Sequence, residues 1–268
     1  MYIYKLNKVI MKKILLFSIF IFSALSCNQT PKKENSNENS TLKEVSEMPH
    51  ILIVNYNLNE MTVEEHSELG TNVAPNFTPE KINGLIGKSF IGNVDNGIYG
   101  GVYQFKSKKS AENYINSEFW LGIEAHPNLV NFKKEIFAVP PFSNQSNGFW
   151  AERKTSSNPD DANRLSVLIV RYNLENMTLD EHLELGVSVA PNFTPEKIDG
   201  LIGKSFIGDP ESGIFGGVYH FKTTDAANKY ISSEFWLGIE AHPNLVNFSK
   251  EIFGVAPISS VSNGIPVL

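Results

Sequence analysis

Most of this chain is one stretch of sequence that occurs twice. Residues 52–139 align without a gap on residues 168–255, and 64 of the 88 paired residues are identical. The sixteen residues SEFWLGIEAHPNLVNF begin once at Ser117 and again at Ser233. A repeat of this length is a duplicated domain rather than a short solenoid unit. Both halves must therefore adopt the same fold, and each surface that one half leaves uncovered has its equivalent on the other.

The two copies divide the chain into segments. We expect a signal peptide at residues 1–27, a tether at 28–48, repeat 1 at 49–140, a linker at 141–164, repeat 2 at 165–257 and a C-terminal tail at 258–268. The tether is rich in Asn, Ser, Lys and Glu and has too few apolar residues to order itself. The linker is polar, and Phe149 and Trp150 are the residues that could fix it to a repeat.

The N-terminal segment predicts export and lipid attachment. From Met11 it reads Met-Lys-Lys, then an apolar run that ends at Ser26, then Cys27, the only cysteine in the chain. A basic start, a short apolar run and a small residue before the cleavage point are typical of a signal peptide. Cleavage before Cys27 resembles the lipobox of bacterial lipoproteins. We expect a cell-envelope lipoprotein, periplasmic or in the outer membrane, held to the membrane through this lipid alone; a plain signal peptide or an uncleaved anchor is the alternative.

The charge of the chain argues against nucleic acid as a partner. The formal net charge is −6, and removal of residues 1–27 takes away four lysines and no acidic residue, which leaves 19 basic and 29 acidic residues. Such a surface repels both nucleic acid and an anionic bilayer. With a single cysteine the chain forms no internal disulfide, so each repeat depends on its apolar core.

Each copy carries signals for six elements. In repeat 1 we expect strands at 51–58, 85–92, 98–105 and 129–139, one helix after Thr62 and a second from Ser107 through Phe119. The sequence Thr62-Val63-Glu64-Glu65 predicts a capping box, in which threonine and glutamate each accept a backbone hydrogen bond from the other. Thr78-Pro79-Glu80 predicts one further helical turn, with proline at its first position.

The element order β-α-β-β-α-β indicates an α+β fold of the ferredoxin-like type. Its four-stranded antiparallel sheet carries both helices on one face and leaves the other face to be covered. A second copy in the same chain is the natural cover. We therefore expect two ferredoxin-like repeats that pack sheet to sheet, a pseudo-dimer within one chain that forms an intramolecular dimeric α/β barrel.

Several short motifs recur in both copies in the same order. They are Gly84-Leu85-Ile86-Gly87-Lys88, Gly100-Gly101-Val102-Tyr103-Gln104-Phe105, Ala111 with Tyr114, and Phe119-Trp120 through Ile136-Phe137-Ala138-Val139. Together they resemble the YdhR-type mono-oxygenase family of the dimeric α/β-barrel superfamily. The resemblance implies oxygenation of small aromatic or quinone-like compounds without a metal, a flavin or any other cofactor. Members of that family are mostly single-domain and not exported, whereas this chain is duplicated and carries an export signal.

Two pairs of titratable residues are the candidates for catalysis. His66 and His182 lie on the first helix of each copy, near the face that packs on the sheet, where an imidazole could act as general acid or base. A structural, partly buried histidine is the alternative. Lys88 and Lys204 lie within a strand between apolar residues, so each ammonium must reach solvent at a sheet edge, find a partner or face a cavity.

A second group of residues could line a pocket for a small apolar or aromatic molecule. It comprises the strand tyrosines and the residues around the repeated tryptophan: Tyr56, Tyr103, Tyr172, Tyr219, Trp120, Trp236, His126 and His242. Tyrosines in strands are equally compatible with a filled core. The pair Glu124 and His126, repeated at Glu240 and His242, precedes a proline and indicates a structural corner, a pocket wall or a metal site. We expect no metal, because no further ligands are evident in the sequence.

Three functions remain open from the sequence. The chain has no phosphate loop, no GxSxG and no HExxH, so the common hydrolase and nucleotide signatures do not apply. The first function is a cofactor-free mono-oxygenase, with a pocket between the sheet and the helices of each half. The second is a lipoprotein that binds a small apolar ligand without chemistry, and the third is an interaction module with a filled core.

Overall fold

The computed structural model describes residues 48–150 and 165–262, which belong to one unit. The predicted signal peptide, the lipid attachment site Cys27 and almost all of the tether lie outside the described residues. Within the described ranges, none of the helices has the length and apolar character needed to cross a membrane.

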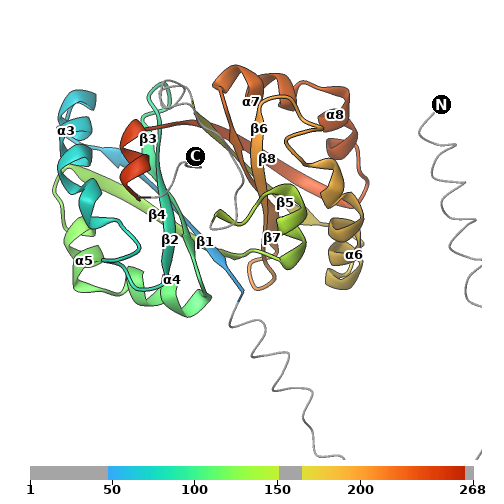
Figure 1. Cartoon of the computed structure of the whole chain (residues 1–268), viewed down its shortest axis with the longest axis horizontal. Helices are drawn as coiled ribbons and strands as arrows, with labels where there is room; N and C mark the ends of the chain where they lie inside the picture. Colours follow the sequence, from blue (N-terminus) through green and yellow to red (C-terminus); the bar gives the residue numbers. More distant parts are fainter. Residues whose placement is uncertain (1–47, 151–164, 263–268) are drawn as a thin grey trace, which may run out of the picture. The chain divides into compact units, whose positions relative to one another are not determined.

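The two repeats have the same elements in the same order (Figure 1). Repeat 1 contains β1 (His50–Leu58), α3 (Val63–Val73), η1 (Ala74–Asn76), β2 (Leu85–Asn93), β3 (Ile98–Phe105), α4 (Lys108–Ile115), α5 (Glu118–Glu124), β4 (Leu129–Ala138) and η2 (Pro141–Ser146). Repeat 2 contains β5 (Ser166–Leu174), α6 (Leu179–Val189), η5 (Ala190–Asn192), β6 (Leu201–Asp209), β7 (Ile214–Phe221), α7 (Thr224–Ile231), α8 (Glu234–Glu240), β8 (Leu245–Val255) and η6 (Pro257–Ser262).

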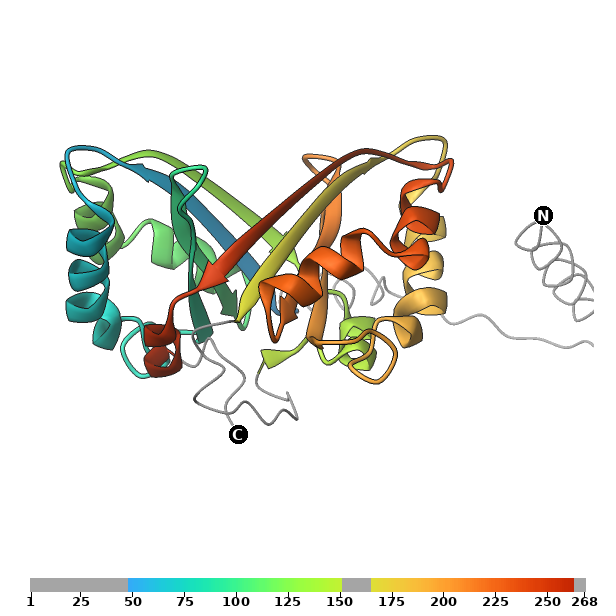
Figure 2. The same ribbon diagram turned by 90° about the horizontal axis from the view of Figure 1, so that it is seen from above.

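All eight strands form one closed barrel in the order β1-β3-β2-β8-β5-β7-β6-β4. Within each repeat the strand pairs are antiparallel, as in a ferredoxin-like sheet. The repeats join at two short seams, where Ile91 pairs with Val255 and Ala138 pairs with Gly208. The predicted fold, two ferredoxin-like repeats joined as a barrel within one chain, is confirmed. Figure 2 shows the strands between two flanking groups of helices.

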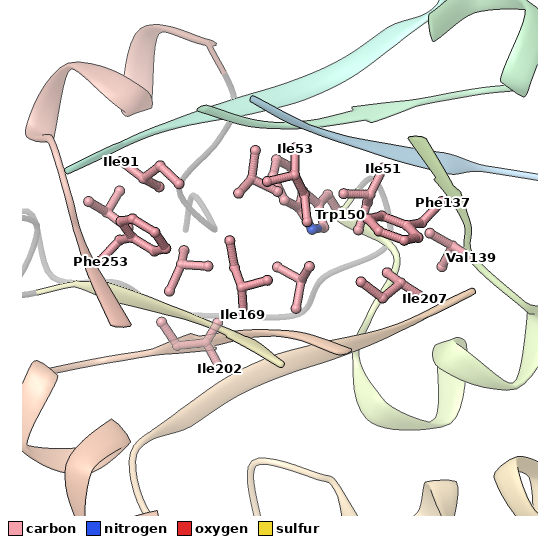
Figure 3. Packing of buried hydrophobic residues seen from close by; sticks show 14 of the residues in the cluster. Ile51, Ile53, Ile91, Phe137, Val139, Trp150, Ile169, Ile202, Ile207 and Phe253 are labelled. Atoms are coloured by element: carbon pink, nitrogen blue, oxygen red, sulfur yellow. The ribbon is translucent and has the colours of Figure 1, made fainter. Parts of the chain in front are cut away.

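Alternation along each strand divides the apolar side chains between two kinds of core. On β1, Ile51 and Ile53 belong to the cluster inside the barrel, whereas Leu52 and Val54 belong to the cluster under the helices of repeat 1. Figure 3 shows the barrel cluster, in which side chains from both sheets meet. Trp150, which follows η2, is buried in this cluster, so the start of the predicted linker helps to fill the barrel.

One local prediction of helix was wrong. The helix expected from Ser107 through Phe119 is two helices, α4 and α5, because Ser117 starts a new one by accepting a hydrogen bond from the Trp120 N–H at 3.2 Å. The single turn expected at Thr78 is present, because the Thr78 carbonyl accepts from the Ile82 N–H at 3.0 Å, and a further short helix, η1, lies before it. In η1 the proline that favours a helix start is Pro75.

The short helix at the end of each repeat packs on the other repeat. η2 lies on β6, and η6 lies on β2; in Figure 1 the red η6 lies over the half that holds β2 and β3. Each is fixed by a serine, because Ser143 Oγ accepts from the Phe206 N–H at 3.1 Å and Ser259 Oγ accepts from the Phe90 N–H at 2.9 Å. The predicted linker and tail therefore begin with ordered turns that belong to the barrel.

Candidate active site

Repeat 1 contains a cavity of about 670 Å³ between its sheet and its helices. Its floor is formed by β1, β2 and β3, and its sides by α3, α5 and the start of η6 from repeat 2. The volume lies within the ~300–1,000 Å³ of ordinary small-molecule sites. The aromatic side chains that line it are Tyr56, Phe77, Phe90, Tyr99, Tyr103, Phe119, Trp120 and Phe132. Such walls suit a planar apolar ligand.

A tyrosine–histidine pair lies at the wall of this cavity. Tyr56 Oη on β1 and His66 Nε2 on α3 are 2.8 Å apart, and the His66 ring lies 4.7 Å from the ring of Tyr99. The capping box predicted from the sequence fixes the start of α3: the Thr62 N–H donates to Glu65 at 2.8 Å, and the Glu65 N–H donates back at 3.2 Å. One turn later the helix brings His66 over the sheet.

Burial keeps this pair neutral. The pKa of His66 is lowered, first by burial and then by the positive charge of Lys88. Burial, with a smaller contribution from Tyr99, raises the pKa of Tyr56. At neutral pH the tyrosine therefore keeps its proton and the imidazole is uncharged. A neutral imidazole in an apolar cavity can accept a proton from a ligand, which is the requirement for a general base.

Lys88 is buried among aromatic rings at the same cavity. Its Nζ lies 3.2 Å from the ring centroid of Phe77, 3.6 Å from that of Phe90 and 4.7 Å from that of Tyr103. Among the described residues no carboxylate pairs with it, and burial lowers its pKa well below the usual value. Lys88 is therefore a proton donor or acceptor of altered strength that faces the ligand space, not an exposed edge residue.

Gly101 makes room for this lysine. A Cβ atom at Gly101 would lie 3.0 Å from Cε of Lys88 and 2.8 Å from the ring of Tyr103. A side chain here would push one of the two residues out of place. The Gly100-Gly101 pair of the sequence thus serves close packing on both faces of β3, because a Cβ at Gly100 would overlap the Val54 carbonyl oxygen at 1.8 Å.

Repeat 2 reproduces the polar geometry. Tyr172 Oη and His182 Nε2 are 2.9 Å apart, and Lys204 Nζ lies 3.3 Å from the ring centroid of Phe193. Burial, followed by the charge of Lys204, lowers the pKa of His182 to about 4. Burial also raises the pKa of Tyr172 and lowers that of Lys204. The two repeats therefore hold the same three functional groups in the same arrangement.

The remaining predicted site residues of repeat 1 also reach this cavity, with more structural roles. Tyr103 and Trp120 line it but are buried, and the Trp120 ring packs against Tyr114 with centroids 5.5 Å apart. His126 lines the cavity as well, and its Nδ1 accepts from the Asn128 N–H at 3.3 Å. Their counterparts Tyr219, Trp236 and His242 keep the same burial and contacts in repeat 2.

Glu124 does not take part in the site. It forms an ion pair with Lys134, and its repeat-2 counterpart Glu240 pairs with Lys250 at 2.6 Å. In residues 48–150 and 165–262, no three metal-ligating side chains come together. The Glu-Ala-His sequence is therefore a corner between α5 and β4, with its histidine at the cavity edge.

Sequence reasoning missed the residues that repeat 2 contributes to the cavity. The end of β8 and the start of η6 supply Val255, Ala256, Pro257 and Ile258 to the wall. No local pattern predicts this, because the contact joins residues more than 150 positions apart. Phe77, Phe90 and Tyr99 were also missed as ligand contacts, although each lies in or beside an element that was predicted.

Comparison with protein families gives a match in the first repeat. Residues 51–148 match the family described as "Putative mono-oxygenase ydhR". Repeat 1 is similar to this family. Repeat 2 has the same fold and 64 of 88 residues identical over the aligned part, so the barrel consists of two YdhR-like halves. Comparison with curated proteins finds no match.

Solved structures share the fold at low identity. A "putative monooxygenase" from Fusobacterium nucleatum subsp. nucleatum is 11% identical over 78% of this chain and 92% of its own, with a TM-score of 0.58. One from Lactobacillus acidophilus is 9% identical over 78% and 94%, with a TM-score of 0.50. A mutant chlorite dismutase from Candidatus Nitrospira defluvii is 6% identical over 80% and 93%, with a TM-score of 0.51. These likenesses concern the YdhR-like, mono-oxygenase-like fold alone.

Proposed function

We propose that this YdhR-like chain is a cofactor-independent mono-oxygenase that acts on a small planar aromatic or quinone-like compound in the cavity of repeat 1. One observation carries the proposal: a neutral histidine, His66, held by Tyr56 at the wall of an aromatic cavity of about 670 Å³. Perturbed groups in a concave apolar site are typical of catalysis.

The chemistry that fits this site begins with loss of a proton from the substrate. For a ring methylene made acidic by a neighbouring carbonyl, His66 takes one proton and leaves a resonance-stabilised carbanion. The carbanion passes an electron to dioxygen, and the two radicals join as a C–O bond to give a peroxide that takes up the proton. Loss of water then converts the methylene to a carbonyl. Overall, one methylene group and one dioxygen molecule give one carbonyl group and one water molecule, so the substrate supplies all four electrons.

The position of Lys88 suits these reaction steps. Its Nζ lies among Phe77, Phe90 and Tyr103, at the wall that an aromatic ligand would contact. An amine or ammonium there can donate a hydrogen bond to a developing superoxide or peroxide oxygen, and the surrounding rings exclude water. The aromatic walls also hold the substrate ring flat.

We also propose that the chain works in the cell envelope, tethered by a lipid at Cys27. The motif of residues 11–27 supports this, and so does the polar tether that follows. The substrate would then be a compound present at a membrane or in the periplasm, which fits an apolar quinone-like molecule.

The test is oxygen uptake by the purified full chain. Anthrone, which carries a ring methylene activated by a carbonyl group, is added to wild type, His66→Gln and His182→Gln, with the spontaneous oxidation rate subtracted. We expect uptake above background in the wild type, at least a tenfold loss in His66→Gln and little change in His182→Gln. If aromatic probes bind but no protein-dependent uptake occurs, the oxygenase assignment fails and ligand binding without chemistry replaces it. If no probe binds at all, the interaction module replaces both.

A further inference from the structure

Each site is closed by a residue from the other repeat, and that residue differs between the two sites. Ile258 on η6 closes the cavity of repeat 1, and its equivalent in the duplication is Phe142 on η2, at the site of repeat 2. Both turns are fixed to the facing strand by a serine hydrogen bond, from Phe90 to Ser259 and from Phe206 to Ser143. The backbone placement is thus the same and the side chain is not.

The Phe142 ring is half-buried and lies against the site of repeat 2. It packs edge-on against Phe206, with ring centroids 5.0 Å apart. A Cβ atom at Gly186 of α6 would meet the Phe142 ring at 2.5 Å, so the ring rests directly on the bare backbone of that helix. Phe142 also packs on the apolar cluster of repeat 2.

The smaller Ile258 leaves the equivalent place open. A Cβ atom at Gly70 would lie 3.2 Å from Ile258 Cδ1, which is the single heavy atom within 4 Å of that position among the described residues outside the backbone of α3 and the two neighbours of Gly70. Phe90 and Gly70 are half-buried and line the cavity, whereas Phe206 and Gly186 are buried. Phe142 therefore covers Phe206 and the turn of α6 at Gly186 in repeat 2. With Ile258 in its place, the equivalent Phe90 and Gly70 remain accessible in repeat 1.

Two other sequence differences also distinguish the site of repeat 1 from that of repeat 2. Ser67 lines the cavity of repeat 1, and its equivalent Leu183 is larger and apolar. Tyr99 contacts His66, whereas Phe215 contacts His182 with the same centroid distance of 4.7 Å and has no hydroxyl. Repeat 1 thus has the smaller residue at the first of these positions and offers two more hydroxyl groups, those of Ser67 and Tyr99.

We propose that the residue at the tip of this exchanged turn sets the size of ligand each repeat admits. Ile258 lets repeat 1 take a ligand of two or more fused rings, and Phe142 occupies the corresponding space in repeat 2. Repeat 2 then contributes Ile258, the residue that closes the site of repeat 1. This inference rests on the proposed function only for the class of ligand; the division of labour between the repeats follows from the geometry.

Reciprocal substitutions at Ile258 and Phe142 test this inference, because both repeats have a position on which a phenylalanine ring can pack. Gly70 and Phe90 match Gly186 and Phe206, so Ile258→Phe can place a ring as Phe142 does. The purified full chain is titrated with 2-naphthol, and its affinity and stoichiometry are measured by calorimetry. We expect one site per chain in the wild type, at least a tenfold weaker Kd in Ile258→Phe and two sites per chain in Phe142→Ile.

Controls separate this from misfolding and from the oxygenase proposal. Ile258→Leu should keep one site, and the double variant Ile258→Phe with Phe142→Ile should return to one; the melting temperature of each variant reports its folding. An unchanged affinity in Ile258→Phe, a single site in Phe142→Ile, or two sites or none in the wild type would overturn the inference. The readout is binding, so a protein that shows the expected pattern yet consumes no oxygen refutes only the oxygenase.

Discussion

Arg171 of repeat 2 donates a hydrogen bond to Glu135 of repeat 1, with Nη2 and Oε2 2.7 Å apart. The same guanidinium binds Glu251 of its own repeat through Nη1, also at 2.7 Å. The two glutamates are equivalent positions of the duplication, but the arginine has no twin, because Asn55 stands at its place in repeat 1. One buried cation therefore serves two acids across the junction, an arrangement that two identical halves could not form.

Removal of this arginine should loosen the barrel. Arg171→Asn, which copies the residue of repeat 1, leaves Glu251 without this cation and Glu135 with the more exposed Lys133 alone, 3.1 Å away. We expect the free energy of unfolding to fall by about 3 kcal/mol, at the lower end of the cost of breaking a buried pair because the Glu251 side chain is about one-third exposed. Urea unfolding followed by circular dichroism measures the change.

An ion pair at the surface provides the matched control. Lys250 lies on the same strand as Glu251 and pairs with Glu240 at 2.6 Å. Because this pair is solvated, Lys250→Asn should cost no more than about 1 kcal/mol. Equal losses in the two variants would show that the interaction of Arg171 across the junction has no special weight.

The stability of repeat 2 should fall in mild acid because of His182. Its pKa is about 4 in the folded chain and near 6.5 when unfolded. Between these values the unfolded chain binds a proton that the folded chain does not, so stability is complete above pH 6.5 and falls as the pH is lowered. The full shift would correspond to roughly 3 kcal/mol; since the ring is partly solvated, we expect about 1–2 kcal/mol.

This effect is measured by comparison with His182→Gln at pH 7 and pH 4.5. The wild type should lose about 1–2 kcal/mol more than the variant over this interval, whereas the carboxylates titrate alike in both. If the two proteins lose the same free energy of unfolding, His182 is not held in its neutral form.

The hydroxyl of Tyr56 should matter for the reaction more than for folding. Tyr56→Phe removes the hydrogen bond to His66, which should cost about 1 kcal/mol of stability. Without this hydrogen bond the imidazole ring should turn more freely over the substrate. We expect a loss of about tenfold in kcat/KM.

Tyr172→Phe makes the same change in repeat 2. It should lower stability equally and leave oxygen uptake unchanged. Comparable losses of kcat/KM in both variants would show that repeat 2 also turns over substrate.

Replacement of a buried lysine should stabilise the chain. Lys204→Met keeps the length of the side chain and its contacts with Phe193 and Phe206, and removes an ammonium whose pKa burial lowers. Cation–π contacts offset about 2 kcal/mol of the burial cost, and burial of a charge without an anion costs more. We expect a gain of about 1 kcal/mol in unfolding free energy at pH 7.

The gain in unfolding free energy of Lys204→Met over the wild type should shrink as the pH rises toward 10.5. The folded pKa of Lys204 is the lower one, so the unfolded lysine binds more protons and the wild type gains stability with pH. Lys88→Met should stabilise repeat 1 in the same way but lower oxygen uptake at least tenfold. Destabilisation of both variants at pH 7 would mean that the aromatic rings fully compensate the buried charge.

The local structure of each repeat could be predicted because it depends on neighbouring residues. The alternation of β1, the capping box of Thr62 and Glu65, and the strand order all follow from patterns a few residues long. The break between α4 and α5 was missed because Ser117 is a weak signal within a helical pattern, and only its hydrogen bond to Trp120 defines the cap. The sequence singles out His66 and Lys88 as titratable groups among apolar residues, but their spacing does not determine that they share a cavity.

The sequence by itself determined that two equal ferredoxin-like halves must cover each other, since a duplicated sheet with an apolar face has no better partner than its copy. Tertiary structure alone decided what makes the halves unequal. Whether Ile258 and Phe142 face a ligand, and whether Arg171 meets Glu135, depends on how the two sheets twist and close. Arg171 and Glu135 are 36 positions apart, and Ile258 and Gly70 are 188 positions apart, so no local pattern encodes these contacts.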